Sequence, residues 1–271
     1  MNIYKLTLLA LFGVSTTPCY SEKVWIVGVI PQQSATKLTK LWKPLLDHIA
    51  RKTGEKFKFQ ASPNFKTFEK HCAQARFDFV YLSPAHYTTF QRSAHYNAIA
   101  KAKNKKIQGI IVVAKDSPLK NVNELNKSKM IFPPPTAFAA SIIPKAYLKN
   151  NNIKVSPAHS INHDNVYYAI SLGLFKAGGG VIRTFNATNP VVKKQLRILW
   201  TSKKYTPHAI AAHQRVPASV AKKFQEALVK MSEDPKARKL YQNMKIKYGF
   251  ERAKDSDWSD VRALGISIIK E

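Results

Sequence analysis

The stretches VWIVGVI at residues 24–30 and FDFVYL at residues 77–82 decide the fold class of this chain. Both are nearly continuous apolar runs, which are typical of parallel strands buried on both faces. After the first run, apolar side chains recur at spacings of three and four between residues 38 and 49, which predicts an amphipathic helix. The second run leads into Pro84, and proline is favoured at the first position of a helix. With a short strand at residues 57–60, this alternation predicts an α/β fold with crossover connections.

The middle third of the chain has the pattern of a second α/β unit. Residues 98–102 and 107–114 are expected to form two strands joined as a hairpin, the second of which leaves one lobe and enters another. Further strands are predicted at residues 130–132, 177–182, 196–201 and 208–213. Helices are predicted after Thr136 and from His163.

These elements predict two lobes, each a sheet flanked by helices, with two hinge crossings between them. Residues 22–114 and 215–271 are expected to form lobe 1, and residues 115–214 are expected to be inserted as lobe 2. The ligand cleft is then expected between the lobes, because clefts in open α/β sheets lie beyond the carboxyl ends of the strands.

The N-terminus has the pattern of an export signal. A lysine near the start precedes an apolar run at residues 6–14 and a polar stretch at residues 15–21, as in a signal peptide. The alternative is an uncleaved anchor helix, but the apolar run is much shorter than the roughly 20 residues that a membrane helix needs. We predict a signal peptide at residues 1–21 and a periplasmic location, and the cleavage position stays open. Cys72 would then be the single cysteine of the mature chain, which excludes an intrachain disulfide.

The composition is strongly basic, with 44 lysines and arginines against 16 aspartates and glutamates and a formal net charge of +28. A basic surface attracts anions, but the lysines are spread along the chain and show no nucleic-acid pattern. An exported protein also has little access to nucleic acid. The charge therefore favours a small anionic ligand without identifying it.

Motifs for catalysis and metal binding are missing from the sequence. There is no Gly-x-Ser-x-Gly and no phosphate-cradling P-loop, and the glycines at residues 178–180 lack the dinucleotide-binding spacing. The histidines show no metal-ligand spacing apart from His208 and His213, which are interpreted as strand ends. We predict neither enzyme activity nor a metal or other cofactor; an exported enzyme on the same fold is the alternative.

Four segments in series carry a resemblance to a known family. They are residues 27–35, residues 77–85, the segment HDNV at residues 163–166 and the segment YGF at residues 248–250. Together they resemble the phosphate/phosphite/phosphonate family of periplasmic binding proteins, which has the type II "Venus flytrap" fold. The resemblance implies a monomeric solute-binding protein that captures a small oxyanion for the membrane permease of an ABC transporter. A sensor that signals to a membrane kinase or cyclase is the alternative.

The chain departs from this family at two places. Family members that hold phosphonate carry a Ser-Thr-Ser turn before the proline of the second-lobe helix, and counting back from Pro144 this chain has Ala137, Phe138 and Ala139 there. The carboxylate that some members use for an aminoalkyl group is also missing, and Arg183 follows the nearby glycines. Both departures imply a different or larger ligand, such as an organic phosphate or carboxylate.

The candidate ligand contacts come from the ends of the predicted strands and the starts of the predicted helices, where unpaired N–H groups favour anions. Each has a structural alternative: a tyrosine or histidine in the core, a threonine that only caps a helix, or an arginine on the surface. The candidates are Tyr81, Thr136, Ala137, Phe138, Ser141, His163, Tyr167, Arg183 and His208.

Overall fold

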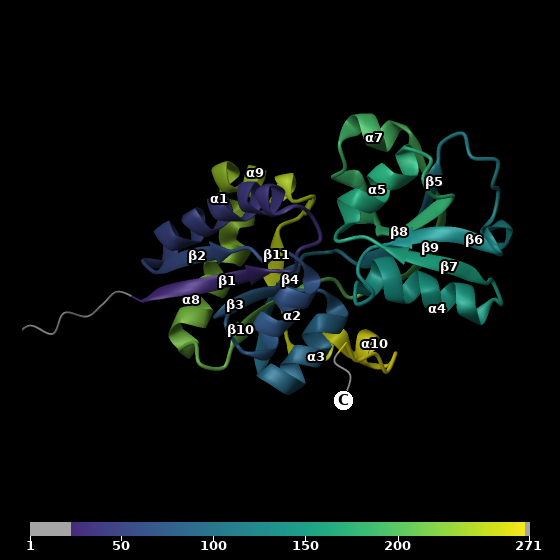
Figure 1. Cartoon of the computed structure of the whole chain (residues 1–271). Helices are drawn as coiled ribbons and strands as arrows, with labels where there is room; N and C mark the ends of the chain where they lie inside the picture. Colours follow the sequence, from purple (N-terminus) through teal and green to yellow (C-terminus); the bar gives the residue numbers. More distant parts are fainter. Residues whose placement is uncertain (1–22, 269–271) are drawn as a thin grey trace, which may run out of the picture.

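Two β-sheets, each covered by helices on both faces, form two lobes that lie side by side in the computed structural model (Figure 1). The structure describes residues 23–268, so the predicted signal peptide lies outside the described residues. None of the helices in the described range is long and apolar enough to cross a membrane. The predicted fold class, with two sheets flanked by helices, is confirmed.

The first lobe contains a six-stranded mixed sheet with the order β11-β4-β10-β3-β1-β2. Its strands are β1 (Val24–Val29), β2 (Lys56–Gln60), β3 (Phe79–Leu82), β4 (Tyr96–Ala102), β10 (Ala209–His213) and β11 (Phe250–Arg252). β1 pairs in parallel with β2 and β3, as the apolar runs predicted, whereas β10 is antiparallel to β3 and β4.

Helices from both ends of the chain cover this sheet. One face carries α1 (Ala35–Thr53), α8 (Ala218–Lys230) and α9 (Pro235–Asn243); the other carries α2 (Phe65–Ala73), α3 (Pro84–Ala94) and α10 (Ser259–Arg262). Short 3-10 turns, η3 (Met231–Glu233) and η4 (Asp255–Trp258), precede α9 and α10. The start of α1 is fixed by Ser34, whose hydroxyl accepts from the Lys37 N–H, and its end by Gly54 in the left-handed region.

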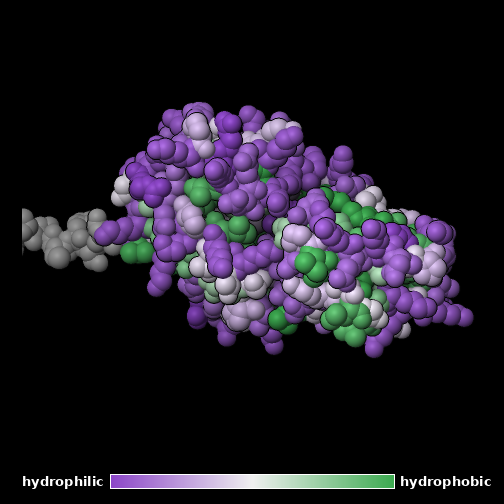
Figure 2. Space-filling view, turned by 90° about the horizontal axis from the view of Figure 1, so that it is seen from above, coloured by the Kyte–Doolittle hydropathy of each residue, from purple (hydrophilic) through white to green (hydrophobic). Residues whose placement is uncertain are grey.

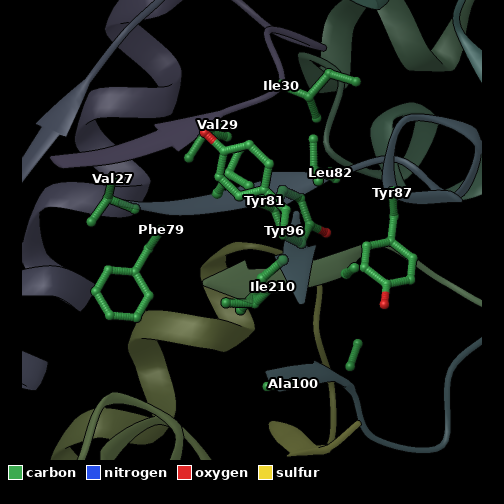
Figure 3. Packing of buried hydrophobic residues seen from close by; sticks show 14 of the residues in the cluster. Val27, Val29, Ile30, Phe79, Tyr81, Leu82, Tyr87, Tyr96, Ala100 and Ile210 are labelled. Atoms are coloured by element: carbon green, nitrogen blue, oxygen red, sulfur yellow. The ribbon is translucent and has the colours of Figure 1, made fainter. Parts of the chain in front are cut away.

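The apolar strand residues of the first lobe form its core (Figure 3). Phe79 stacks on Phe224 of α8 with ring centroids 4.3 Å apart, and Tyr81 packs against Trp42 of α1 at 5.0 Å. Cys72 is a free cysteine and is fully buried in this core. This packing ties the N-terminal and C-terminal parts of the chain into one lobe.

The second lobe contains a five-stranded sheet with the order β7-β6-β8-β5-β9. Its strands are β5 (Ile107–Ala114), β6 (Ser128–Phe132), β7 (Val155–His159), β8 (Ala177–Val181) and β9 (Leu196–Tyr205). One face carries η1 (Val122–Leu125), the π-helical turn η2 (Phe138–Ile142) and α4 (Ile143–Asn150). The other face carries α5 (His163–Ser171), α6 (Ile182–Asn186) and α7 (Pro190–Lys194).

Glycines in the second sheet let a helical turn approach the strands. A Cβ on Gly179 would lie 2.0 Å from the carbonyl oxygen of Ala140, and a Cβ on Gly109 would lie 2.1 Å from that of Ala139. Both carbonyls belong to η2, so its backbone rests directly on β5 and β8. Gly179 thus has the role of admitting another backbone segment close to the sheet.

The chain crosses between the two sheets at residues 103–106 and again at residues 206–208. This corrects the predicted hairpin, because β4 belongs to the first sheet and β5 to the second. The strands also fall outside the expected lobe bounds: β5 was placed in lobe 1 and β10 in lobe 2, and each pairs with the other sheet. An apolar run does not reveal which sheet will supply its hydrogen-bond partners.

Candidate functional site

The cleft between the lobes is formed by segments where a strand ends and a helix begins. Gln32 and Gln33 lie between β1 and α1, Ser83 lies between β3 and α3, and His163 is the first residue of α5. Arg183 lies in α6, directly after β8. Helix N-termini offer N–H groups without intrahelical partners, together with partial positive charge. The cleft therefore lies where the physical argument for anion binding had placed it.

The lobes touch each other directly across this cleft. The backbone N–H of His163 donates to the carbonyl of Gln32 at 3.0 Å, and the Arg183 guanidinium donates to the side-chain oxygen of Gln32. At another point, Thr136 of the second lobe donates to Glu69 of the first at 2.6 Å. The structure thus shows the lobes in a closed arrangement.

A cavity of about 370 Å³ opens beside these contacts; it is the largest of three neighbouring hollows at the cleft, and we call it the main cavity. Tyr81, Arg183 and His208 form its inner part together with Val181, and the two chain crossings form its walls. The remaining lining residues are Ala102, Lys103, Asn104, Lys105, Lys106, Ile107, Gln108, Ile182, Lys204, Pro207, Ile246, Lys247 and Tyr248.

Two smaller hollows adjoin the main cavity and share residues with it. One is lined by Gln32, Gln33, Tyr81 and Arg183, and has a volume of about 10 Å³. The other lies between Ser83, His163 and residues 137–140, and has no room for a water molecule. Phe138, which is 1% exposed, fills this second space and packs edge-on against Tyr205.

Buried polar atoms around the cleft lack hydrogen-bond partners within the described residues. They are Nε2 of His163, Nε2 of His208, and both the oxygen and nitrogen of the Gln33 side chain. His163 and His208 are 1% and 4% exposed, so water does not freely satisfy these atoms. Buried polar groups are normally hydrogen-bonded. Unpartnered atoms at three positions around one cleft therefore indicate a place for a polar ligand.

His163 is held in place by its other ring nitrogen. Nδ1 lies 3.1 Å from the hydroxyl of Thr184, which in turn is hydrogen-bonded to the backbone of β8. Burial, and then the nearby Arg183 guanidinium, lower the pKa of His163 to about 3. The imidazole is therefore neutral at pH 7.

His208 stacks on Tyr81, with ring centroids 4.8 Å apart and planes at 16°. Burial is the main cause that lowers the pKa of His208 well below its usual value, and the Arg183 charge acts in the same direction. Burial also raises the pKa of the Tyr81 hydroxyl. Both groups are therefore neutral at pH 7, and Arg183 supplies the fixed positive charge of the inner cavity.

Carboxylates are missing from the lining of the main cavity and of both adjoining hollows within the described residues. One acidic side chain, Glu69, lies behind Ser83. Glu69 Oε1 is 3.0 Å from Nε2 of His86, and Nδ1 of His86 is 2.6 Å from the Ser83 hydroxyl. The lining is thus positive or neutral, as an anion site requires.

Six of the nine predicted site residues line the cleft. Tyr81, Arg183 and His208 lie in the main cavity, while Ala137, Phe138 and His163 line the second of the smaller hollows.

The other three predicted residues have their hydroxyls occupied elsewhere in the protein. Ser141 donates to the carbonyl of Pro133 at 2.9 Å, and Thr136 donates to Glu69. Tyr167 is fully buried in the core of the second lobe, where its hydroxyl contacts Thr184 and the backbone of β8. Ser141 and Tyr167 therefore stabilise the second lobe instead of lining a pocket, whereas Thr136 joins the two lobes across the cleft.

Sequence reasoning missed Gln32 and Gln33 as site residues. They are 4% and 2% exposed, although neither caps a helix. Two glutamines between a buried strand and the Ser34 cap of α1 were the available signal. The lysines of the crossings were also missed, because a lysine-rich turn is ordinarily a solvated surface.

Outside the cleft, the surface is mostly hydrophilic (Figure 2). Figure 2 shows hydrophobic patches chiefly over the second lobe. Most of the exposed large hydrophobic side chains belong there: Ile161, Tyr168, Leu172, Leu174 and Val191. None of these residues lines the cleft, so they do not contribute to the candidate site.

Two α/β lobes closed over a positively charged cleft define a two-lobed solute-binding protein. A family model described as "ABC transporter, phosphonate, periplasmic substrate-binding protein" matches residues 27–258. The chain therefore belongs to this family, and the resemblance inferred from its four segments is confirmed. Within residues 23–268, no group of three histidines, cysteines or carboxylates is arranged to hold a metal ion.

Solved structures share the fold at low sequence identity. A binding protein component of an ABC phosphonate transporter from Pseudomonas aeruginosa matches with a TM-score of 0.83 and 15% identity, over 90% of this chain and 86% of that one. PhnD1 from Prochlorococcus marinus, solved with methylphosphonate, matches with a TM-score of 0.81 and 17% identity, over 90% and 97%. A Xanthomonas citri protein bound to ATP matches with a TM-score of 0.69 and 15% identity, over 89% and 95%. No curated protein matches the chain in sequence.

Proposed function

We propose that this protein binds a phosphonate or a related phosphoryl anion in the cleft between its lobes and delivers it to the permease of an ABC transporter. The observation that carries the proposal is the set of buried, unpartnered atoms around Arg183: Nε2 of His163, Nε2 of His208 and the amide of Gln33. Family membership and the methylphosphonate complex of PhnD1 from Prochlorococcus marinus support the same ligand class.

The chemistry of the site suits reversible binding of an anion. Arg183 offers a planar guanidinium that can hold two oxygens of a phosphoryl group at once. Nε2 of each imidazole and the side-chain N–H groups of Gln33 can donate further hydrogen bonds to the anion. We propose that the ligand makes these contacts to both lobes and so stabilises the closed state. The proposed role is capture and release, without a chemical step.

The proposal is tested by calorimetric titration of the purified protein with methylphosphonate, phosphite and phosphate. We expect one-to-one binding of at least one of them, and a stabilisation against unfolding of about 2.7 kcal/mol at a hundredfold excess over Kd. The ligand should be recovered unchanged after hours, because binding without turnover distinguishes this protein from an exported enzyme. Absence of heat and of stabilisation with all three anions, in a protein shown to be folded, would overturn the proposal.

A further inference from the structure

Five lysines line the main cavity in addition to Arg183. They are Lys103, Lys105, Lys106, Lys204 and Lys247. Three of them belong to the first crossing between the lobes, Lys204 belongs to β9 just before the second crossing, and Lys247 follows α9. The topology therefore brings cations from three separate segments to one cavity.

These lysines are not neutralised by the protein. Within residues 23–268, none of the five forms an ion pair with a carboxylate. Lys101, which lies outside the cavity in β4, shows the contrast, because it is 2.7 Å from Asp257 and 3.5 Å from Glu251. A lysine next to the cavity is thus paired with carboxylates, whereas the positive charges of the five lysines that line it are not.

Only part of this lysine set is occupied by other contacts. Lys105 donates to the carbonyl of Lys245 at 2.5 Å, and Lys106 donates to the Thr206 hydroxyl at 3.2 Å. Burial, and then the positive charge of Arg183, lower the pKa of Lys105. The side chains of Lys103 and Lys204 have no polar partner within the described range. Lys247 lies over the ring of Tyr248, with Nζ 5.0 Å from the ring centroid. Within the described residues, Lys103 and Lys204 are thus the two cations of the set that are free to meet a ligand.

The main cavity is larger than a bare phosphonate group would fill. Its volume is about 370 Å³, and cavities of about 300–1,000 Å³ are those that enclose drug-sized organic ligands. Of its lining residues, Tyr81 and His208 are buried and Arg183 is partly buried, whereas the free lysines Lys103 and Lys204 are exposed at its outer part. A ligand that filled the space would hold one anionic group near Arg183 and extend its organic arm past the lysines.

From this arrangement we infer that the preferred ligand carries a second anionic group on its organic arm, a carboxylate or a second phosphoryl group, which Lys103 and Lys204 recognise. The inference rests on the proposed function, because it assumes that the first anionic group binds near Arg183. It also excludes aminoalkyl phosphonates as preferred ligands, since a cationic arm would meet five lysines and no carboxylate.

The test uses three ligands whose arms have the same length and different terminal groups. Propylphosphonate is neutral at its end, 3-phosphonopropionate is anionic, and 3-aminopropylphosphonate is cationic. We expect 3-phosphonopropionate to bind about tenfold more tightly than propylphosphonate, since several partly exposed charge pairs contribute together. We expect 3-aminopropylphosphonate to bind more weakly than either. The preference should shrink as salt is raised, because exposed charges are screened.

A pair of double variants separates local recognition from net charge. Lys103→Gln with Lys204→Gln removes the two free cations of the cavity, and should reduce the preference for 3-phosphonopropionate to about twofold. Lys40→Gln with Lys222→Gln removes the same charge from exposed positions on α1 and α8, and should keep the full preference.

The outcomes distinguish this inference from the proposed function. If propylphosphonate bound as tightly as 3-phosphonopropionate or more tightly, the inference of a second anionic group would be overturned, while the proposed phosphonate binding would stand. A preference lost equally in both double variants would show a general charge effect and would also overturn the inference. Failure of all phosphonates to bind the folded protein would overturn both proposals.

Discussion

Thr136 of the second lobe donates a hydrogen bond of 2.6 Å to Oε1 of Glu69 in the first lobe, and the same oxygen lies 3.0 Å from Nε2 of His86. His86 continues to the Ser83 hydroxyl at 2.6 Å, at the start of α3. A side chain of one lobe is thus connected to a helix N-terminus at the cleft of the other. Because the Thr136–Glu69 bond needs both lobes, it contributes to the closed state alone.

Replacing Thr136 by Val should shift the protein toward an open state. The side chain keeps its shape but loses the donor, and a hydrogen bond of this kind contributes about 1 kcal/mol. Ligand affinity should fall about fivefold, since binding would have to supply the lost closing free energy. Titration gives the affinity, and small-angle scattering of the ligand-free protein should show a larger radius of gyration.

The matched control is Thr136→Ser, which keeps the hydroxyl and should keep both the affinity and the radius of gyration. Wild-type affinity and compactness in Thr136→Val would show that the bond makes no difference to closure.

Two substitutions of His163 should separate its two ring nitrogens. In His163→Asn, the amide can replace Nδ1 near Thr184 but leaves nothing at the position of Nε2. In His163→Gln, the longer amide reaches the position of Nε2. We expect His163→Asn to lower the affinity for methylphosphonate at least tenfold, because a lost hydrogen bond to a charged group costs about 1.5–3 kcal/mol.

His163→Gln should retain more of the binding than His163→Asn, as measured by the same titration. Equal affinity in the wild type and in His163→Asn would remove this histidine from the ligand site. Thermal unfolding of both variants checks that the second lobe remains folded.

The sequence predicted the fold class because several strands are continuous apolar runs that alternate with segments of helical periodicity. It did not predict the strand partners. In β5, Ile110 and Val112 face α5, while Ile111 and Val113 face α4, so the strand is apolar on both faces and fits either sheet. The edge strand β7 escaped prediction because it is half exposed and contains Pro157.

The site was predicted where a residue type carries its own chemical signal. Arg183, His163 and His208 stood out as cationic or polar residues at element ends, and the structure places all three at the cleft. Tyr167 carried the same kind of signal, but its side chain, one helical turn after His163, lies in the core of the second lobe. The free lysines gave no signal, because recognising them needs the two crossings side by side.

Replacing Gly179 by Ala should destabilise the second lobe severely. The new Cβ would lie 2.0 Å from the carbonyl oxygen of Ala140, and the obstacle is backbone that cannot rotate away. Overpacking of this kind costs about 3 kcal/mol or more. The control is Gly173→Ala, where nothing lies within 4 Å and the left-handed φ of +72° costs about 1 kcal/mol. Chemical denaturation measures both, and equal losses would contradict the close approach of η2 to β8.

The stability of the ligand-free protein should fall as the pH is lowered from 7 to 5, and His163 should account for a measurable part of the fall. Its pKa is about 3 in the folded state, against about 6.5 in an unfolded chain. Between these values the unfolded state binds more protons, so this stabilisation is complete above pH 6.5 and is lost as the pH falls toward 3. The buried His208 acts with the same sign.

Free energies of unfolding at pH 7, 6 and 5 test this dependence. The contribution of one such histidine approaches about 1.4 kcal/mol per pH unit below pH 6, and His163→Gln should lose that part of the slope while keeping the rest. The carboxylates whose pKa is lowered, such as Glu55 and Asp257, titrate below this range and so do not obscure the difference. Parallel slopes in the wild type and in His163→Gln would mean that the imidazole titrates freely, and that the cleft is open to water in solution.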